Sequence, residues 1–197
     1  MVEKISLPLQ APKALSGEDA RNWYRRRNFV VCPVVLVTTV NREGIVNAAV
    51  KTNFMTVDSM TRYAFHCSPQ HHTNRNIMET KEFVINVPTE DIIGKVLKAA
   101  VLTMEPCPPG VNEIDRGGLT PIPSEKVRPP RIQECVAHYE CVLDWHNEGL
   151  IVGRAVAVSV DKSLLDRPNS GRMIVVGGGR TPDSYGVVCE TKVWPKF

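Results

Sequence analysis

The stretch CPVVLVTTVNREGIVNAAV, residues 32–50, decides the fold class because it contains two β-forming runs separated by a turn. Residues 32–40 are rich in β-branched side chains, and the Asn41-Arg42-Glu43-Gly44 sequence that follows is typical of a turn. Residues 45–50 then resume an extended pattern. Two strands joined by so short a turn pair antiparallel, so the stretch predicts a β-hairpin.

More strands than helices follow along the chain. The remaining strand candidates are residues 62–67, 83–87, 134–144, 150–160 and 172–176, and the two long ones flank an Asn147-Glu148-Gly149 turn. One helix is expected to start at Ser16 and end near Arg27, and another to open at Thr89. Helices do not alternate with strands as in a parallel sheet. We therefore expect a mainly β chain with a few helices, folded as a closed or nearly closed antiparallel barrel.

The composition indicates one domain with no broad nucleic-acid surface. The chain has 197 residues, 43% of them hydrophobic, and a formal net charge of +3. We expect a single domain over residues 1–197, with the N-terminal helix and a Pro/Gly-rich excursion at 105–130 as additions. No apolar stretch reaches the length of a membrane span, and the N-terminus lacks the apolar core of a signal peptide. The expected location is therefore cytoplasmic, with no membrane partner.

Cysteines and histidines do not form a standard metal-ligand pattern. The six cysteines are scattered without a C-x-x-C pair, so we predict no metal site. Cys135 and Cys141 lie an even number of residues apart, which predicts that one strand buries both on the same face. His138 and His146 are candidates for redox chemistry, as groups that would assist a hydride donor or protonate a redox cofactor.

A polar run, SPQHHTNRN at residues 68–76, precedes a short helix that contains Ile77 and Met78. Ser68 or Thr73 could cap this helix. A helix N-terminus presents free N–H groups and a partial positive charge, and the hydroxyls, imidazoles and Arg75 of the run add donors and charge. The run therefore fits an anion site, and it also fits an ordinary capped helix that follows a polar loop.

A second polar stretch, NAAVKTNFMT at residues 47–56, leaves the second strand of the hairpin. Ala48 and Ala49 are small enough to let a flat ligand approach the backbone, while Lys51, Thr52 and Asn53 supply hydrogen-bond donors. A flavin needs such a combination along its pyrimidine edge, its ring and its phosphate. A hairpin strand with an exposed polar face would show the same residues.

The order of these pieces resembles the flavin reductase-like family, the FMN-binding split barrels that include the flavoredoxins. The resemblance covers roughly residues 25 to 180 and begins at Pro33-Val34-Val35-Leu36-Val37-Thr38-Thr39. It is strongest at HTNRNIMETKEFVIN, residues 72–86, which is similar to the family's Thr-x-x-Asn-Ile and Glu-Phe-Val-x-Asn signature. A departure occurs at residues 58–63, DSMTRY, where family members commonly have Asp-Pro-Pro in a loop that borders the flavin ring.

The resemblance implies an antiparallel Greek-key split β-barrel, usually a homodimer, with FMN near the subunit interface. By position, the residues that would contact the flavin are Asn47, Ala48, Ala49, Lys51, Thr52 and Asn53, and those at the phosphate end are Ser68, His72, Thr73 and Arg75. No catalytic acid or base is required, because the flavin carries the chemistry.

Three functions remain open at this point. The first is an oxidoreductase in which NADH or NADPH reduces the flavin. The second is an FMN-binding electron carrier that exchanges electrons with a redox partner protein and has no pyridine-nucleotide site. The third is a split-barrel interaction protein that has lost flavin.

Overall fold

The computed structural model describes residues 8, 10, 12–16, 19, 23, 29–58, 61–99, 112–166, 173–177 and 185–188. Of the helix expected between Ser16 and Arg27, Asp19 and Trp23 are described, and both are helical. Residues 105–111 of the expected excursion lie outside the described part. No helix in the described ranges has the length and apolar character needed to cross a bilayer.

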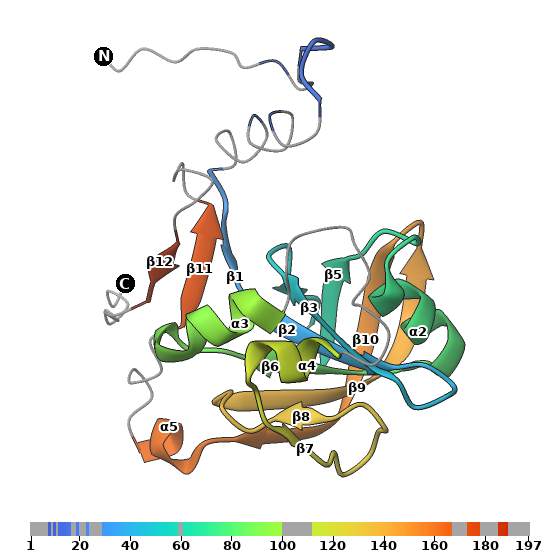
Figure 1. Ribbon diagram of the computed structural model, residues 1–197, viewed down its shortest axis with the longest axis vertical. Helices are drawn as coiled ribbons and strands as arrows, with labels where there is room; N and C mark the ends of the chain where they lie inside the picture. Colours follow the sequence, from blue (N-terminus) through green and yellow to red (C-terminus); the bar gives the residue numbers. More distant parts are fainter. Residues whose placement is uncertain are drawn as a thin grey trace, which may run out of the picture.

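One antiparallel sheet of seven strands forms the body of the molecule (Figure 1). In spatial order its strands are β3 (Val46–Lys51), β2 (Val35–Val40), β6 (Glu82–Val87), β9 (Ala137–Asn147), β10 (Leu150–Val160), β5 (Arg62–His66) and β4 (Met55–Thr56). The β2–β3 hairpin predicted from residues 32–50 is confirmed, with Thr39 opposite Asn47. The chain crosses from β5 to β6 and later inserts β9 and β10 between them, which is the expected Greek-key order.

The sheet must curl because its two edge strands are consecutive in the chain. β3 and β4 are separated by residues 52–54 alone, so the ends of these strands are at most about 14 Å apart. A flat sheet of seven strands would place its edges about 29 Å apart. The observed half-barrel meets this requirement and confirms the predicted split barrel.

Helices and two small sheets surround the half-barrel (Figure 1). They are α2 (His72–Thr80), η1 (Glu90–Ile92), α3 (Ile93–Ala99), α4 (Glu113–Gly117), α5 (Lys162–Asp166), the β7 (Pro121–Ile122) and β8 (Arg131–Ile132) pair, and the β1 (Val31–Pro33), β11 (Ile174–Gly177) and β12 (Gly186–Val187) sheet. The segment 105–130, expected as an irregular excursion, therefore contains α4 and β7, and β8 directly follows it.

The two faces of the sheet bury separate cores. Along β2, Val35 and Val37 point into the half-barrel, where they pack in one cluster with Phe65 and Phe83. Leu36 points to the opposite face and packs in a second cluster with residues of α3 and α4. This alternation is the period of two that a strand buried on both faces requires.

Two strand predictions need correction. The first strand of the hairpin is interrupted at Val34, whose N–H bonds to the Ile174 carbonyl and not to β3. The long strand predicted from residue 134 starts at Ala137, because Cys135 lies in a turn closed by its N–H and the Ile132 carbonyl. Cys135 and Cys141 are both buried, but Cys141 packs in the cluster inside the half-barrel, the inner cluster, and Cys135 packs in the cluster on the opposite face, the outer cluster. The prediction that both point to the same face was therefore wrong.

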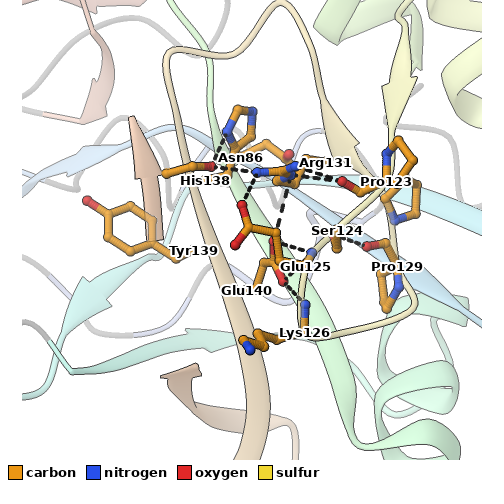
Figure 2. Close-up of polar contacts among 12 residues, drawn as sticks. Asn86, Pro123, Ser124, Glu125, Lys126, Pro129, Arg131, His138, Tyr139 and Glu140 are labelled. Atoms are coloured by element: carbon orange, nitrogen blue, oxygen red, sulfur yellow. Dashed lines mark hydrogen bonds and ion pairs between the residues drawn. The ribbon is translucent and has the colours of Figure 1, made fainter. Parts of the chain in front are cut away.

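Asn86 and Glu140 attach the segment 123–132 to the sheet. The Asn86 amide donates to the Leu36 carbonyl at 3.1 Å, and its oxygen accepts from the Ile132 N–H at 2.9 Å. Glu140 accepts from the backbone N–H groups of Glu125 and Lys126, at 2.9 and 2.7 Å (Figure 2). The Asn of the Glu-Phe-Val-x-Asn motif thus has a structural role in this chain.

Candidate functional site

The start of α2 meets the inner face of β3. α2 begins at His72, and the N-cap residue His71 makes no side-chain cap hydrogen bond. The prediction that Ser68 or Thr73 caps this helix was wrong, because Ser68 lies three residues before the N-cap and its hydroxyl accepts from the Gln70 N–H. The helix N-terminus is therefore not closed by its own cap side chain and can present N–H groups to a ligand.

Thr73 connects this helix to β3. Its side chain is buried, and its hydroxyl oxygen accepts from Asn47 Nδ2 at 2.9 Å. The Asn47 and Asn76 amides also approach Thr39 Oγ1, at 3.4 and 3.0 Å. Because the Thr73 oxygen is an acceptor in its bond to Asn47, the hydroxyl proton can be donated to a ligand.

Asn47, Ala49 and Lys51 share one face of β3, as alternate residues of a strand must. Ala48 points the other way and packs in the outer cluster with Leu36, so its small side chain serves the core. The structure therefore brings three of the four predicted β3 residues to the side that faces α2.

Lys51 is a buried ammonium with a sulfur as its hydrogen-bond partner. Its side chain is 7% exposed, and Nζ donates to Cys67 Sγ at 3.2 Å and lies 5.9 Å from the centre of the Phe65 ring. Within the described ranges, no carboxylate lies at ion-pair distance from Lys51. Burying a charge without an opposite charge is costly, so the site favours an anionic ligand.

The other predicted contacts surround this centre. Asn53 donates to the His66 carbonyl at 3.3 Å, and Thr52 beside it is exposed. Ser68 is partly exposed, whereas His72 and Arg75 are exposed on the first turn of α2. Burial, followed by the nearby Lys51 charge, lowers the pKa of His71.

Comparison with known proteins identifies the family. Residues 26–175 match the model of the flavin reductase like domain, which is more than half of the chain. The chain belongs to the flavin reductase like domain family. An uncharacterized protein of Aquifex aeolicus is 33% identical over 147 residues, which cover 68% of this chain and 71% of that protein.

Solved structures of low identity share the fold of this flavin reductase-like chain. Nitrilotriacetate monooxygenase component B from Bacillus cereus superposes with a TM-score of 0.76 at 23% identity and covers 97% of this chain and 100% of its own. Flavoredoxin of Desulfovibrio vulgaris (Miyazaki F) gives a TM-score of 0.74 at 21% identity, covering 96% and 97%.

Asp58 is the first residue of DSMTRY, the sequence that differs from the Asp-Pro-Pro of the resemblance, and its carboxylate accepts several hydrogen bonds in this flavin reductase-like chain. Asp58 accepts from the N–H and hydroxyl of Thr61, at 2.8 and 2.6 Å, and from Arg62 Nη1 at 2.9 Å. These bonds, led by the Thr61 hydroxyl, hold the pKa of Asp58 well below its usual range. These hydrogen bonds fix Thr61 and Arg62 relative to Asp58.

Sequence reasoning missed Thr39, Asn76 and Cys67. Thr39 could have been found from the hairpin register, which places it opposite Asn47, and Asn76 from its position one helical turn after Thr73. No sequence signal shows that Cys67 contacts Lys51, since that contact depends on how the sheet curls.

The two histidines considered for redox chemistry both lie on β9. His138 is buried: Nε2 donates to the Ile132 carbonyl at 2.8 Å, and Nδ1 accepts from the Ser159 hydroxyl at 3.1 Å. His146 is exposed near the end of β9. His138 thus supports β8 and β10, and no group of three or more acidic, His or Cys side chains suited to a metal occurs in the part of the chain described.

Burial lowers the pKa of His138, which predicts a pH dependence of stability. The folded state then binds fewer protons than the unfolded state just below the usual histidine pKa of about 6.5. We expect the free energy of unfolding to be highest above that pH and to fall as the pH drops through it. In urea titrations from about pH 7.5 to 5, His138→Gln should flatten this slope and His146→Gln should not. An unchanged slope in His138→Gln would contradict the assignment.

Proposed function

We propose that this chain binds FMN and acts as an NAD(P)H-dependent flavin reductase. The observation that carries the proposal is a buried Thr73 hydroxyl and a buried Lys51 ammonium beside a helix start without a side-chain cap. Hydroxyl, ammonium and helix N–H groups are the donors that a phosphate monoester requires. The family assignment supplies the second support.

The phosphate end is proposed at the first turn of α2. Thr73 would donate its hydroxyl proton there, while Ser68, His72 and Arg75 lie at the rim and add donors and charge. The lowered pKa of His71 leaves its imidazole neutral near pH 7, so the positive charge comes from Lys51, Arg75 and the helix.

The flavin ring is proposed along the face of β3 that carries Asn47, Ala49 and Lys51. Ala49 leaves room for a flat ring, and the amides of Asn47 and Asn53 can hydrogen-bond its polar edge. When bound, the flavin accepts a hydride from NADH or NADPH and passes the electrons on, and the chain binds and orients it. We also propose a homodimer, which sedimentation of the purified protein would test.

A second candidate is an electron carrier that lacks a nicotinamide site. The fold likeness to a flavoredoxin favours it. Flavin that is bleached under anaerobic conditions by NADH or NADPH alone supports the reductase. Bleaching by dithionite, with no response to either nucleotide, supports the carrier and contradicts the reductase. Protein that neither carries nor binds FMN contradicts both.

Thr73→Ala tests the phosphate site directly. Losing one hydrogen bond to a charged group should weaken FMN binding by about 1–3 kcal/mol, or about 5- to 150-fold in Kd. Fluorescence titration of the flavin-free protein measures this change. Thr73→Ser should keep the affinity near that of the original protein. Thr80→Ala, which removes a hydroxyl at the other end of α2, is the control and should leave binding unchanged. Equal affinity of Thr73→Ala and the original protein would show that the phosphate lies elsewhere.

A further inference from the structure

Cys67 lies in an environment unlike that of the other buried cysteines. It directly follows β5, is 2% exposed, and places Sγ 3.2 Å from Lys51 Nζ and 3.9 Å from His71 Nδ1. An ammonium has donors only, so the sulfur must act as the acceptor. A cation beside a cysteine sulfur stabilises the negative charge that the sulfur gains as it gives up its proton and reacts.

Cys141 and Cys135 provide the comparison within the same chain. Cys141 is fully buried among apolar side chains, and its thiol donates to the Tyr139 carbonyl at 3.5 Å, a role that requires the proton. Cys135 is buried in the outer cluster. Burial raises the pKa of both thiols far above the usual value, so both stay protonated.

The charge of Lys51 is the second, independent observation. Its ammonium is more than nine-tenths buried, and Nζ points at Cys67 Sγ, while the described residues place no carboxylate within ion-pair reach. Among the described residues, the Cys67 sulfur is the acceptor toward which this buried ammonium points. A buried cation without an opposite charge favours a reaction that places negative charge on the neighbouring sulfur.

We propose that Cys67 is a redox-sensitive thiol that hydrogen peroxide oxidises to a sulfenic acid. The Cys67 sulfur attacks one peroxide oxygen as the thiol gives up its proton, an S–O bond forms and the O–O bond breaks, and the leaving hydroxide takes that proton and becomes water. The sulfur loses two electrons and the peroxide gains them. A small dithiol reverses the step through a mixed disulfide and releases the added oxygen as water.

The position of Cys67 determines both how peroxide reaches the sulfur and what oxidation of the sulfur changes. His71, which covers one side of the sulfur, is itself partly exposed, so a side-chain rotation can admit a molecule as small as peroxide. The added oxygen occupies space beside Lys51 Nζ at the start of α2. Oxidation thus changes both the hydrogen bonding and the free volume of the proposed anion site.

The test uses the flavin-free full chain, so it is independent of whether FMN binds. The protein is treated with hydrogen peroxide in the presence of dimedone, which traps sulfenic acids, and labelled peptides are quantified by mass spectrometry over time. Cys67 should be labelled at least about tenfold faster than Cys141 and Cys135, and a dithiol added before dimedone should abolish the label. Labelling of Cys67 no faster than that of Cys141 would overturn the proposal without any variant.

Two substitutions of Lys51 test the role of its charge. Lys51→Met should slow the labelling of Cys67 by about tenfold, and Lys51→Arg should restore most of the rate. Circular dichroism and thermal melting confirm that each variant is folded before it is compared. An unchanged rate in folded Lys51→Met would show that Lys51 does not activate the thiol and would overturn the proposal.

Discussion

Glu140→Gln should lower the free energy of unfolding by about 3 kcal/mol, because it leaves three inward-facing donors without their anion. The Glu140 carboxylate is 2% exposed and accepts from the N–H groups of Glu125 and Lys126. Arg131 Nε lies 3.7 Å from the same carboxylate, and its guanidinium also donates to the Pro123 carbonyl (Figure 2). A glutamine would keep one acceptor oxygen and place an NH₂ group against these donors.

Glu125→Gln is the matched control for this experiment. Glu125 makes the same type of ion pair with Arg131, at 3.5 Å, but its side chain is 63% exposed. An exposed pair contributes about 0–1 kcal/mol, so the control should stay close to the original protein. A melting temperature about 6–12 °C lower in Glu140→Gln would match the expected loss. Equal melting temperatures of the two variants would show that the segment 123–132 is held by other contacts.

Local sequence signals predicted the strands well and their ends poorly. The turn at Asn41–Gly44 fixes the β2–β3 hairpin, because a short polar turn with a glycine at positive φ permits little else. By contrast, Val34 leaves the hairpin because its N–H bonds to Ile174, far along the chain. That bond follows from the pairing of β1 with β11 in the separate three-stranded sheet, and residue types around Val34 carry no trace of it.

For the candidate site, residue types could be predicted but contacts could not. Asn47, Lys51 and Thr73 were recognisable because their side chains suit a phosphate and a polar ring edge. The Asn47–Thr73 hydrogen bond joins residues 26 positions apart, and the Lys51–Cys67 contact joins the ends of β3 and β5. Both depend on closure of the half-barrel, which brings the edge strand β3 close to β5 and α2. The cap of α2 was mispredicted because a turn, closed by the His71 N–H and the Ser68 carbonyl at 3.0 Å, separates Ser68 from the start of the helix.

Gly153→Ala should destabilise the protein by about 3 kcal/mol, because β10 has no space for a methyl group there. A Cβ at Gly153 would lie 2.1 Å from Phe83 Cζ and 3.2 Å from Cys141 Cβ. The Phe83 ring cannot withdraw easily, since it is fully buried and packs edge-on against Phe65 at 5.6 Å. Protein interiors are packed too densely to absorb such an overlap without moving a ring or the strand.

Urea denaturation of Gly153→Ala, Gly94→Ala and Gly153→Ala/Phe83→Leu separates this steric effect from the general effect of replacing a glycine. Gly94 lies exposed in α3, where an added methyl group would meet no atom within 4 Å, so alanine there should stabilise by about 0.5–1 kcal/mol. Phe83→Leu shortens the ring side chain that meets the methyl group. The double variant should therefore lose less than the sum of the two single losses, with a coupling of about 1 kcal/mol or more. Additive losses would mean that β10 shifts as a whole and that Phe83 is not what excludes a side chain at Gly153.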